Sequence, residues 1–442
     1  MSTFIINGGK PLKGIYEVSG AKNAAPKLLI ASLLARERCV FHNIPKFSDT
    51  YRSLEALVTV GATVRFANNR SVEVTCKDIH GTEIPMDAMR ARQSVLFIGA
   101  MLARAGRVVI HPPQGDAIGR RPLNRHLEGI RALGGRIHQR GNLLVASLPA
   151  RPKSTVYSFE KNTHCGTENL ILASVFNRGT VTLKNAALEP EVDNLIETLN
   201  RMGARIARAE NHRTVIIQGV KPWLRGAISA SISDRLESAT AITISILTGG
   251  KVKISHAPRH LILPFAQFCE LRGVDLQWAE QKVSVEKVPP YLSPASLTTD
   301  WHPGFMTDWQ PLATLMLAVR AKGRSVIHER IYETRWRYLD ELKNMGVRFR
   351  KFQPAGFGPR DYNFNDEDYR DHEPHAAYVW GPTKLKPAIL RAHDVRAGID
   401  MLIAALIAKG RSVIHDPHDH IDRGYENIVG KLTRLGADIT RV

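Results

Sequence analysis

The chain repeats one pattern of apolar and polar positions six times. In each copy, apolar residues recur at steps of three and four, a glycine follows, and β-branched or apolar residues begin directly after it. These steps predict an amphipathic helix, the glycine predicts the end of that helix, and the residues after it predict a strand. The six copies are residues 54–64, 127–137, 195–206, 265–276, 338–349 and 428–439.

The glycines set the period of the repeat. Successive glycines lie 73, 69, 70, 73 and 90 residues apart, so four intervals are nearly equal and the last is longer. A polar, aromatic and turn-rich insertion at about 351–380 accounts for the longer interval, and we expect it to form a long surface loop or lid. The six glycines are Gly61, Gly134, Gly203, Gly273, Gly346 and Gly436.

A second repeat precedes each copy of the first. It is an apolar helix that ends in a turn and a short strand, at residues 28–41, 95–110, 170–183, 242–254, 315–327 and 402–414. Together the two repeats predict a unit with two helices and several strands. Because these helices are apolar and the strands have polar flanks, we expect the helices inside and the sheets outside. A chain of 442 residues is too long for one ordinary core, so two domains are expected.

Composition and cysteine spacing narrow the class of protein. Hydrophobic residues make up 43% and charged residues 23%, as in a globular protein, and no apolar run approaches the roughly eighteen residues of a membrane span. The N-terminus lacks the basic and apolar segments of a signal peptide. The four cysteines lie far apart and form no Cys-x-x-Cys pair, which argues against a zinc site or a disulfide framework. We therefore expect reduced thiols, a cytoplasmic location and no metal.

The formal net charge of +19 favours the binding of an anionic partner. Nucleic acid is one candidate, since Lys and Arg neutralise phosphates. However, the basic residues are spread along the whole chain, and neither a zinc-finger spacing nor an aromatic RNA-binding signature is present. A pocket for small polyanions explains the charge better.

Three segments between the repeats carry candidate chemistry. Ser19-Gly-Ala-Lys22-Asn23 is a small-residue loop that opens a helix, and such a loop can bring backbone donors and a lysine to an anion, although a plain turn with a surface lysine has the same pattern. The second segment is QGDAIGRRPLNRH at 114–126, and the third is WHPGFMTDWQP at 301–311. The second and third segments each contain an aspartate that could transfer protons.

These segments and the six units resemble the enolpyruvyl transferases, a family that includes UDP-N-acetylglucosamine 1-carboxyvinyltransferases and 5-enolpyruvylshikimate-3-phosphate synthases. The resemblance runs from Phe4 to Val442 apart from the insertion. It implies a two-domain inside-out α/β barrel made of six repeated α/β units, three per domain, with helices inside and sheets outside. It implies one domain at 22–231 and another formed by 1–21 plus 232–442, with the active site in the cleft between them.

The resemblance also implies an activity. We expect a transferase that moves the enolpyruvyl group of phosphoenolpyruvate to the 3′-hydroxyl of UDP-N-acetylglucosamine and releases phosphate, without a cofactor. In the family this is the first committed step of peptidoglycan precursor synthesis, which connects the protein to cell-wall biogenesis, cell shape and cell division. The expected partners are these two small molecules, with no nucleic acid and no membrane.

Three alternatives remain open at this point. One is an enolpyruvyl transferase that acts on another uridine nucleotide, and a second is one that acts on shikimate 3-phosphate. The Ile-Gly-x-Arg-Pro sequence at 118–122 argues against shikimate. The third is a non-catalytic paralogue that binds sugar nucleotides, and the presence of both aspartates and a full set of arginines disfavours it.

The resemblance assigns catalysis to Asp116, Asp308 and Lys22. Asp116 stands where most members carry a cysteine that acts as general acid, and an aspartate supplies that acid if partial burial raises its pKa. Asp308 would take the proton of the acceptor hydroxyl, and Lys22 would contact phosphoenolpyruvate. A Thr-Asp pair before an apolar helix is also a good N-cap, so Asp308 could serve in both ways. Without the cysteine, we expect the protein to be insensitive to the epoxide fosfomycin.

The same resemblance assigns substrate binding to a larger set. Arginines suit a cage for one phosphate and one carboxylate because guanidinium binds oxyanions in bidentate fashion. Asn124 and Arg125 replace an Asp and, usually, a Leu of the family loop, yet an Asn can still pair with a uracil edge. Asp234 and Glu237 lie at the return crossing between domains and could order the cleft. The substrate-binding residues implied are Asn23, Arg92, Arg121, Pro122, Leu123, Asn124, His126, Lys161, Thr163, His164, Ile331, Arg335, Arg396 and Arg423.

Overall fold

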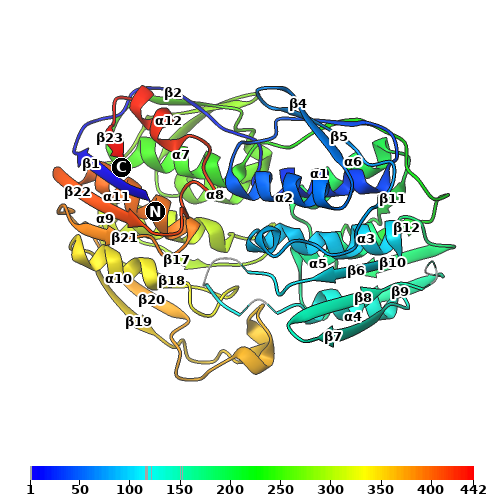
Figure 1. Cartoon of the computed structure of the whole chain (residues 1–442). Coiled ribbons are helices and arrows are strands. Elements are labelled where there is room, and N and C mark those ends of the chain that lie inside the picture. Colours follow the sequence, from blue (N-terminus) through cyan, green and yellow to red (C-terminus); the bar gives the residue numbers. More distant parts are fainter. Residues whose placement is uncertain (1, 115–117, 121, 150, 152) are drawn as a thin grey trace. The chain divides into compact units, whose positions relative to one another are not determined.

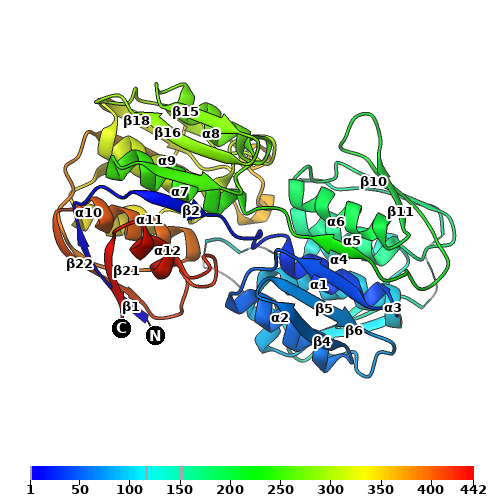
Figure 2. The same cartoon turned by 90° about the horizontal axis from the view of Figure 1, so that it is seen from above.

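The structure is a computed structural model that describes residues 2–114, 118–120, 122–149, 151 and 153–442. Contacts within the chain divide it into two compact units (Figures 1 and 2). Among the described residues, unit 1 holds 2–19, 118–120 and 233–442, and unit 2 holds 20–114, 122–149, 151 and 153–232. Each unit is therefore assembled from separate stretches of the chain.

The described strands of unit 2 form three sheets. In two of them a short edge strand runs parallel to its neighbour and the remaining pairs are antiparallel. In the third, an isolated parallel bridge between Glu83 and Val109 takes the place of the edge strand. In spatial order the sheets are β13 (Ile228–Ala230), β3 (Cys39–His42), β5 (Ser71–Thr75) and β4 (Thr63–Asn68); β6 (Arg107–Ile110), β8 (Leu143–Ser147) and β7 (Arg136–Arg140); and β11 (Arg205–Arg208), β12 (Val215–Gln218), β10 (Thr180–Lys184) and β9 (Thr155–Ser158).

The described strands of unit 1 repeat this plan in three further sheets. Each again has one short parallel edge strand beside antiparallel pairs. The sheets are β15 (Asp275–Ala279), β16 (Lys282–Lys287), β14 (Val252–Ser255) and β2 (Gly14–Glu17); β17 (Ser296–Thr298), β18 (Gly323–His328), β20 (Ala376–Gly381) and β19 (Arg348–Phe352); and β21 (Ile389–Arg391), β22 (Gly410–Asp416), β1 (Ser2–Gly8) and β23 (Asp438–Arg441).

Two helices accompany each sheet. One is buried nearly all round, as an apolar helix must be, and packs against the equivalent helices of its unit. These are α1 (Ala25–Ala31), α3 (Phe97–Ala105), α5 (His164–Ser174), α7 (Arg235–Thr248), α9 (Gln310–Arg320) and α11 (Val395–Ile407). The other is amphipathic: α2 (Ser48–Thr59), α4 (Asn124–Ala132), α6 (Pro190–Arg201), α8 (Leu263–Glu270), α10 (Arg337–Asn344) and α12 (Ile428–Arg434). In neither unit do the described helices have the length and apolar character that would let one cross a membrane.

The predicted repeat is confirmed, with helices at the centre of each unit and sheets around them (Figure 1). The glycines that were expected to end the amphipathic helices all have positive φ, between 80° and 111°. A side chain disfavours that conformation, which explains why glycine recurs there.

Two edge strands are exchanged between the units. Strand β2 precedes α1 in the sequence, yet it pairs with β14 of unit 1. Strand β13 precedes α7, yet it pairs with β3 of unit 2. In addition, the N-terminal β1 lies between β22 and β23, so the start of the chain completes the sheet formed by its end. These long-range pairings decide where the chain passes from one unit to the other.

The long last interval corresponds to the connection between β19 and β20, residues 353–375. It contains two 3₁₀ turns, η6 (Pro359–Asp361) and η7 (Asp366–Asp368). Of the range of about 351–380, residues 351–352 belong to β19 and residues 376–380 belong to β20, and these two strands pair with each other.

The insertion has an aromatic core of its own. Tyr362, Phe364, Tyr369 and His375 form mutual ring contacts with centroids 4.6–6.5 Å apart. Tyr362 is 1% exposed and His375 is fully buried. Because buried aromatic area is the main source of stability in so small a segment, the insertion forms a packed lobe rather than the plain surface loop that its polarity suggested.

Candidate active site

Lys22 and Asn23 lie in the turn that leads into α1. Lys22 is 7% exposed, and its Nζ donates to Asp49 Oδ2 at 2.8 Å. Asn23 Oδ1 accepts from Gln93 Nε2 at 2.9 Å. Gln93 follows Arg92 in the 3₁₀ turn η3 (Arg92–Leu96), so the structure brings the lysine, the asparagine and this turn together in unit 2.

A buried cluster lies at the start of α5. Lys27 Nζ is 2.7 Å from His164 Nε2 and 2.7 Å from Glu168 Oε2. Burial opposes charge on Lys27, but the Glu168 carboxylate outweighs it and leaves the pKa of Lys27 above its ordinary value. Since an ammonium group only donates, the contact with Lys27 makes His164 Nε2 an acceptor, which leaves the ring proton on Nδ1. The Nδ1–H is then the ring donor that remains for a ligand.

The loop before α5 is joined to the first turn of α4. Thr163 caps α5, with its Oγ1 accepting from Gly166 N at 3.2 Å, and Lys161 is half-buried just ahead of it. Arg125 Nη1 donates to Asn162 O at 3.3 Å. Two segments expected to bind the sugar nucleotide therefore lie side by side at two helix N-termini, which attract anions.

His126 is a buried neutral histidine rather than a cationic phosphate ligand. Gly99 N donates to Asn169 Oδ1 at 2.6 Å, so the amide nitrogen of Asn169 faces His126 Nδ1 at 3.1 Å. Nδ1 is then the acceptor, and the ring proton sits on Nε2. Burial, followed by the charges of Arg92 and Arg125, lowers the pKa of His126 to about 3. Hydrogen bonding through Nε2 is therefore what this ring can offer a substrate.

Two important residues of the 114–126 segment, Asp116 and Arg121, lie outside the described residues. Next to Arg121, Pro122 is exposed, while Leu123 and Asn124 are half-buried where α4 begins.

In unit 1, Asp308 lies between two arginines. Its Oδ1 is 2.6 Å from Arg335 Nη2 and 3.9 Å from Arg396 Nε. Burial opposes the charge of both guanidinium groups. At Arg335 this effect of burial is smaller than the effect of nearby carboxylates, of which Asp308 and Asp394 contribute most. At Arg396 it is smaller than the combined effect of Tyr425 and Asp308. The pKa of each arginine therefore lies above its usual value. These residues come from the turn before α9, the segment before α10 and the first turn of α11, so the site depends on tertiary packing.

Asp308 does not cap a helix, contrary to one sequence-based expectation. It lies inside the 3₁₀ turn η5 (Thr307–Trp309), whose N-cap is Met306, and α9 follows with Trp309 at its N-cap. Neither position makes a side-chain capping bond. The Arg335 guanidinium binds the Asp308 carboxylate instead.

Glu329 organises the segment that contains Ile331. Its Oε1 accepts from Ile331 N at 2.9 Å and from Tyr332 N at 3.2 Å, and its Oε2 accepts from Thr307 Oγ1 at 2.9 Å. Thr307 Oγ1 also accepts from Arg335 at 2.9 Å. Burial raises the pKa of Glu329. The carboxyl thus connects the Ile331 turn to the residues around Asp308.

The last expected arginine, Arg423, lies half-buried in the turn after β22. Its neighbour Gly424 approaches Arg396, since a Cβ added there would be 3.8 Å from Arg396 Nη1. Tyr425 Oη accepts from Arg396 Nη1 at 2.9 Å. This turn therefore borders the Asp308 cluster.

Asp234 and Glu237 hold the return crossing of the chain. Asp234 caps α7 by accepting from the backbone N–H groups of Leu236 and Glu237. Glu237 accepts from Ser19 N at 2.8 Å and also binds the ammonium group of Lys431. Both carboxylates are buried and have local structural partners.

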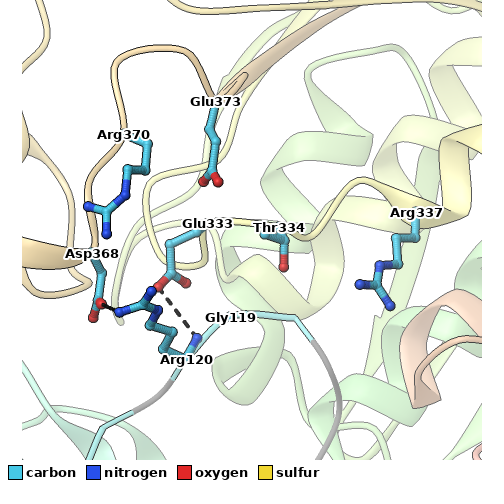
Figure 3. Close-up of a pocket in the computed structure, with 8 residues that line it drawn as sticks. All are labelled: Gly119, Arg120, Glu333, Thr334, Arg337, Asp368, Arg370 and Glu373. Carbon is cyan, nitrogen blue, oxygen red and sulfur yellow. Dashed lines mark hydrogen bonds and ion pairs between the residues drawn. The ribbon is translucent and has the colours of Figure 1, made fainter.

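A pocket of about 250 Å³ borders the described part of the 114–126 segment in unit 1. Figure 3 shows charged side chains of this segment, of the residues ahead of α10, of the first residue of α10 (Arg337) and of the insertion. It is lined by Gly119, Arg120, Glu333, Thr334, Arg337, Asp368, Arg370 and Glu373.

The structure adds residues that the sequence patterns did not single out. Lys27 stands among apolar residues in α1, and an isolated lysine in an apolar helix is a detectable signal. Asp49 and Glu329 gave no such signal, because the side chains that they bind, Lys22 and Thr307, lie 27 and 22 residues away in the sequence. No group of three or more His, Cys, Asp or Glu side chains that could hold a metal occurs within the described residues.

Sequence comparison places the chain among carboxyvinyl transferases. Residues 6–432 match the family described as EPSP synthase (3-phosphoshikimate 1-carboxyvinyltransferase). A UDP-N-acetylglucosamine 1-carboxyvinyltransferase of Chlamydia abortus is 36% identical over 448 residues, covering 99% of this chain and 98% of the relative. A protein of the same name from Solibacter usitatus is 35% identical over 443 residues, covering all of both chains.

Solved structures show the same fold. The enolpyruvyl transferase NikO from Streptomyces tendae has a TM-score of 0.86 at 23% identity, covering 100% of this chain and 99% of that one. An EPSP synthase from Acinetobacter baumannii has a TM-score of 0.73 at 16% identity, covering all of both chains. The predicted inside-out α/β fold is thereby confirmed.

Proposed function

Because this chain belongs to the enolpyruvyl transferase family of EPSP synthase and the UDP-N-acetylglucosamine 1-carboxyvinyltransferases, we propose that it transfers the enolpyruvyl group of phosphoenolpyruvate to the 3′-hydroxyl of UDP-N-acetylglucosamine. Phosphate is the second product. The observation that carries the choice of acceptor is the match to transferases of that name over essentially the whole length of both chains. By its chemistry the protein is a transferase that acts on two small molecules.

In the proposed reaction Asp308 is the base. Two guanidinium groups favour its ionised form, which can accept a proton. As Asp308 takes the proton of the sugar hydroxyl, the oxygen bonds to C2 of phosphoenolpyruvate. The double bond takes up a proton at C3 from Asp116, which leaves a tetrahedral adduct. Asp116 then takes a proton back from C3 while the bond from C2 to the phosphate oxygen breaks. The leaving phosphate takes up the proton that Asp308 holds, so both carboxyl groups return to their starting states.

The cationic residues supply electrostatic stabilisation. Negative charge spreads over the phosphate and carboxylate during addition and elimination, and fixed donors that meet this charge lower the barrier. We assign this role to Lys22, Arg92, Arg121, Arg335, Arg396 and Arg423. Arg335 and Arg396 are already ordered by Asp308, so little reorganisation is needed when the substrate binds.

The nucleotide is assigned to unit 2. Lys161, Thr163 and His164 stand at the start of α5, next to the segment from Pro122 to Asn124. The helix N-terminus and the Nδ1–H of His164 would bind the diphosphate. Asn124 offers a donor and an acceptor for the uracil edge.

A phosphate-release assay tests the proposal. Purified protein should release phosphate only when phosphoenolpyruvate and UDP-N-acetylglucosamine are both present, and mass spectrometry should find the enolpyruvyl ether of the sugar nucleotide. Faster turnover with another uridine nucleotide or with shikimate 3-phosphate would contradict UDP-N-acetylglucosamine as the acceptor, but enolpyruvyl transfer would still be the reaction. No turnover with any of these acceptors would favour a binding protein.

We also propose a cytoplasmic location and a place in peptidoglycan precursor synthesis. All four cysteines, Cys39, Cys76, Cys165 and Cys269, are free thiols, as suits a reducing compartment. Separating cell fractions and probing for the protein tests the location directly.

A further inference from the structure

Three contacts hold the short segment Ile118–Arg120 within unit 1, and Figure 3 shows the two that Arg120 makes. Thr334 N donates to Ile118 O at 3.3 Å. Arg120 N donates to Glu333 Oε1 at 3.4 Å. The Arg120 guanidinium donates to Asp368 Oδ1 at 3.0 Å. The segment is therefore bound through its backbone and through one side chain.

Glu333 fits closely against this backbone. The residue is 5% exposed, and a Cβ added to Gly119 would lie 2.0 Å from Glu333 Oε2. With the carboxylate in this position there is no room for a side chain at position 119, and a larger residue there would displace the end of the Glu333 side chain. The fit indicates that the segment is bound in a defined register.

Asp368 comes from the insertion, and the insertion fixes its position. The backbone N–H of Asp368 donates to Asn365 O at 2.9 Å in the turn η7. In the sequence, residues of the aromatic core come both before and after this turn. The lobe is tied to the segment ahead of α10, because Arg330 Nε donates to Asp361 O at 2.7 Å and Asn363 N donates to Arg330 O at 2.8 Å. The insertion and the Glu333 turn therefore act as one support.

The Asp368–Arg120 pair is asymmetric. The Arg120 side chain is 69% exposed, whereas that of Asp368 is 4% exposed. An exposed pair contributes little, but a carboxylate that is already out of water loses its counter-charge when the arginine is removed. Folding of the lobe thus creates a buried carboxylate that selects a cation at position 120.

We propose that Asp368 and Glu333 are positioning residues that hold Ile118–Arg120 in place, and that the 353–375 insertion serves to supply Asp368. In the sequence, the segment follows the proposed general acid Asp116 by two residues, so its register determines where that acid can act. This consequence rests on the proposed function, whereas the docking itself does not.

Hydrogen–deuterium exchange of the full-length protein tests the docking without any reaction. Asp368→Asn keeps the shape of the side chain and removes its charge. Amide exchange in the peptide containing Ile118–Arg120 should become roughly tenfold faster, the effect of losing one charged hydrogen bond. Asp371→Asn makes the same chemical change at an exposed position of the same insertion and should leave that exchange unchanged. Equal exchange in wild type and Asp368→Asn would overturn the docking.

A double-mutant cycle tests whether the two residues act through one contact. Arg120→Ala and Asp368→Asn should each lower kcat/KM for phosphate release, and the double variant should lose no more than the worse single one. We expect kcat to fall roughly tenfold for each, with KM for the sugar nucleotide nearly unchanged, because an acid is misplaced while binding remains. Additive losses, or a change confined to KM, would refute the positioning role.

The two tests separate this inference from the proposed function. If the exchange result holds and wild-type protein has no transferase activity, the proposed function fails and the docking stands. If activity is present and the exchange is unaffected by Asp368→Asn, the positioning role fails and the reaction stands.

Discussion

At the residue scale, the chemistry depends on how single side chains are paired. Asp308 owes its place to Arg335 and Arg396, which come from two other elements. Lys27 and Glu168 show the same dependence, since each is buried and carries the counter-charge of the other. Buried charges of this kind are sensitive to the loss of one partner.

Asp308→Asn should slow phosphate release by roughly 10²–10⁴-fold, the usual share of a positioned acid or base. An amide keeps the shape but cannot take the hydroxyl proton. Steady-state kinetics measures the loss, and circular dichroism establishes that the fold is kept. Asp340→Asn is the control, because its carboxylate is 58% exposed and pairs only with Lys351 among the described residues. Activity of Asp308→Asn within a few-fold of wild type would show that the base is another group.

The residue at position 116 should determine the response to the epoxide fosfomycin. An epoxide such as fosfomycin needs a thiolate nucleophile, and a carboxylate attacks it far more slowly. Cys165 is no substitute, because burial raises the pKa of its thiol. We therefore expect the protein to resist fosfomycin and Asp116→Cys to become sensitive. Mass spectrometry after incubation with the drug and the sugar nucleotide measures this, and a stoichiometric adduct on wild-type protein would contradict the expectation.

At the element scale, the insertion is stabilised by its own aromatic core. His375 is fully buried there with no hydrogen-bond partner for either ring nitrogen among the described residues, and burial lowers its pKa to about 4. The neighbouring His328 also has its pKa lowered to about 4, by burial and then by Arg330 and His375. Burial thus disfavours the charged form of both rings.

This predicts an acid-labile lobe. The pKa of His375 is about 4 in the folded protein and 6.5 in the unfolded chain. The neutral buried ring therefore contributes fully to the stability of the lobe above pH 6.5, and this stability is lost as the pH falls towards 4. His375→Phe removes the titrating ring and the unpaired nitrogens. Relative to wild type, it should slow hydrogen exchange of residues 353–375, and this slowing should be larger at pH 5 than at pH 8. His372→Phe, at an exposed position of the same lobe, is the control. An equal effect of His375→Phe at both pH values would contradict the titration.

At the scale of the whole molecule, the chain closes on itself. The N-terminal β1 is the inner strand between β22 and β23, and its Phe4 and Ile6 are fully buried. The two ends of the chain therefore belong to one sheet, and unit 1 cannot be completed until both are present. Such pairings between distant segments are expected to form slowly.

Ile6→Ala should therefore weaken the C-terminal sheet. Truncating a fully buried isoleucine costs about 2–5 kcal/mol, and hydrogen exchange of β22 and β23 should accelerate while unit 2 keeps its protection. Ile15→Ala removes the same atoms from a strand of the same unit, but Ile15 is 62% exposed, so a change within about 0.5 kcal/mol is expected. Denaturant titration gives both values, and equal losses would show that burial of β1 does not stabilise the sheet.

Local patterns in the sequence determined the repeating elements. Helix periodicity and the recurrent glycines depend only on neighbouring residues, because a helix end with positive φ disfavours any side chain wherever it occurs. Six such units and three motifs were enough to identify the family, and with it the fold and the reaction. They also located Lys22, Asp308 and the arginines as candidates.

Only the tertiary structure decided which distant groups meet. The exchange of β2 and β13, the closure of the C-terminal sheet by β1 and the pairing of Asp368 with Arg120 join residues hundreds of positions apart. Such contacts leave no periodic trace in the sequence, since each depends on the packing of whole elements rather than on neighbouring side chains. For the same reason the polar composition of the insertion concealed its aromatic core, which forms only when residues 353–375 fold back on themselves.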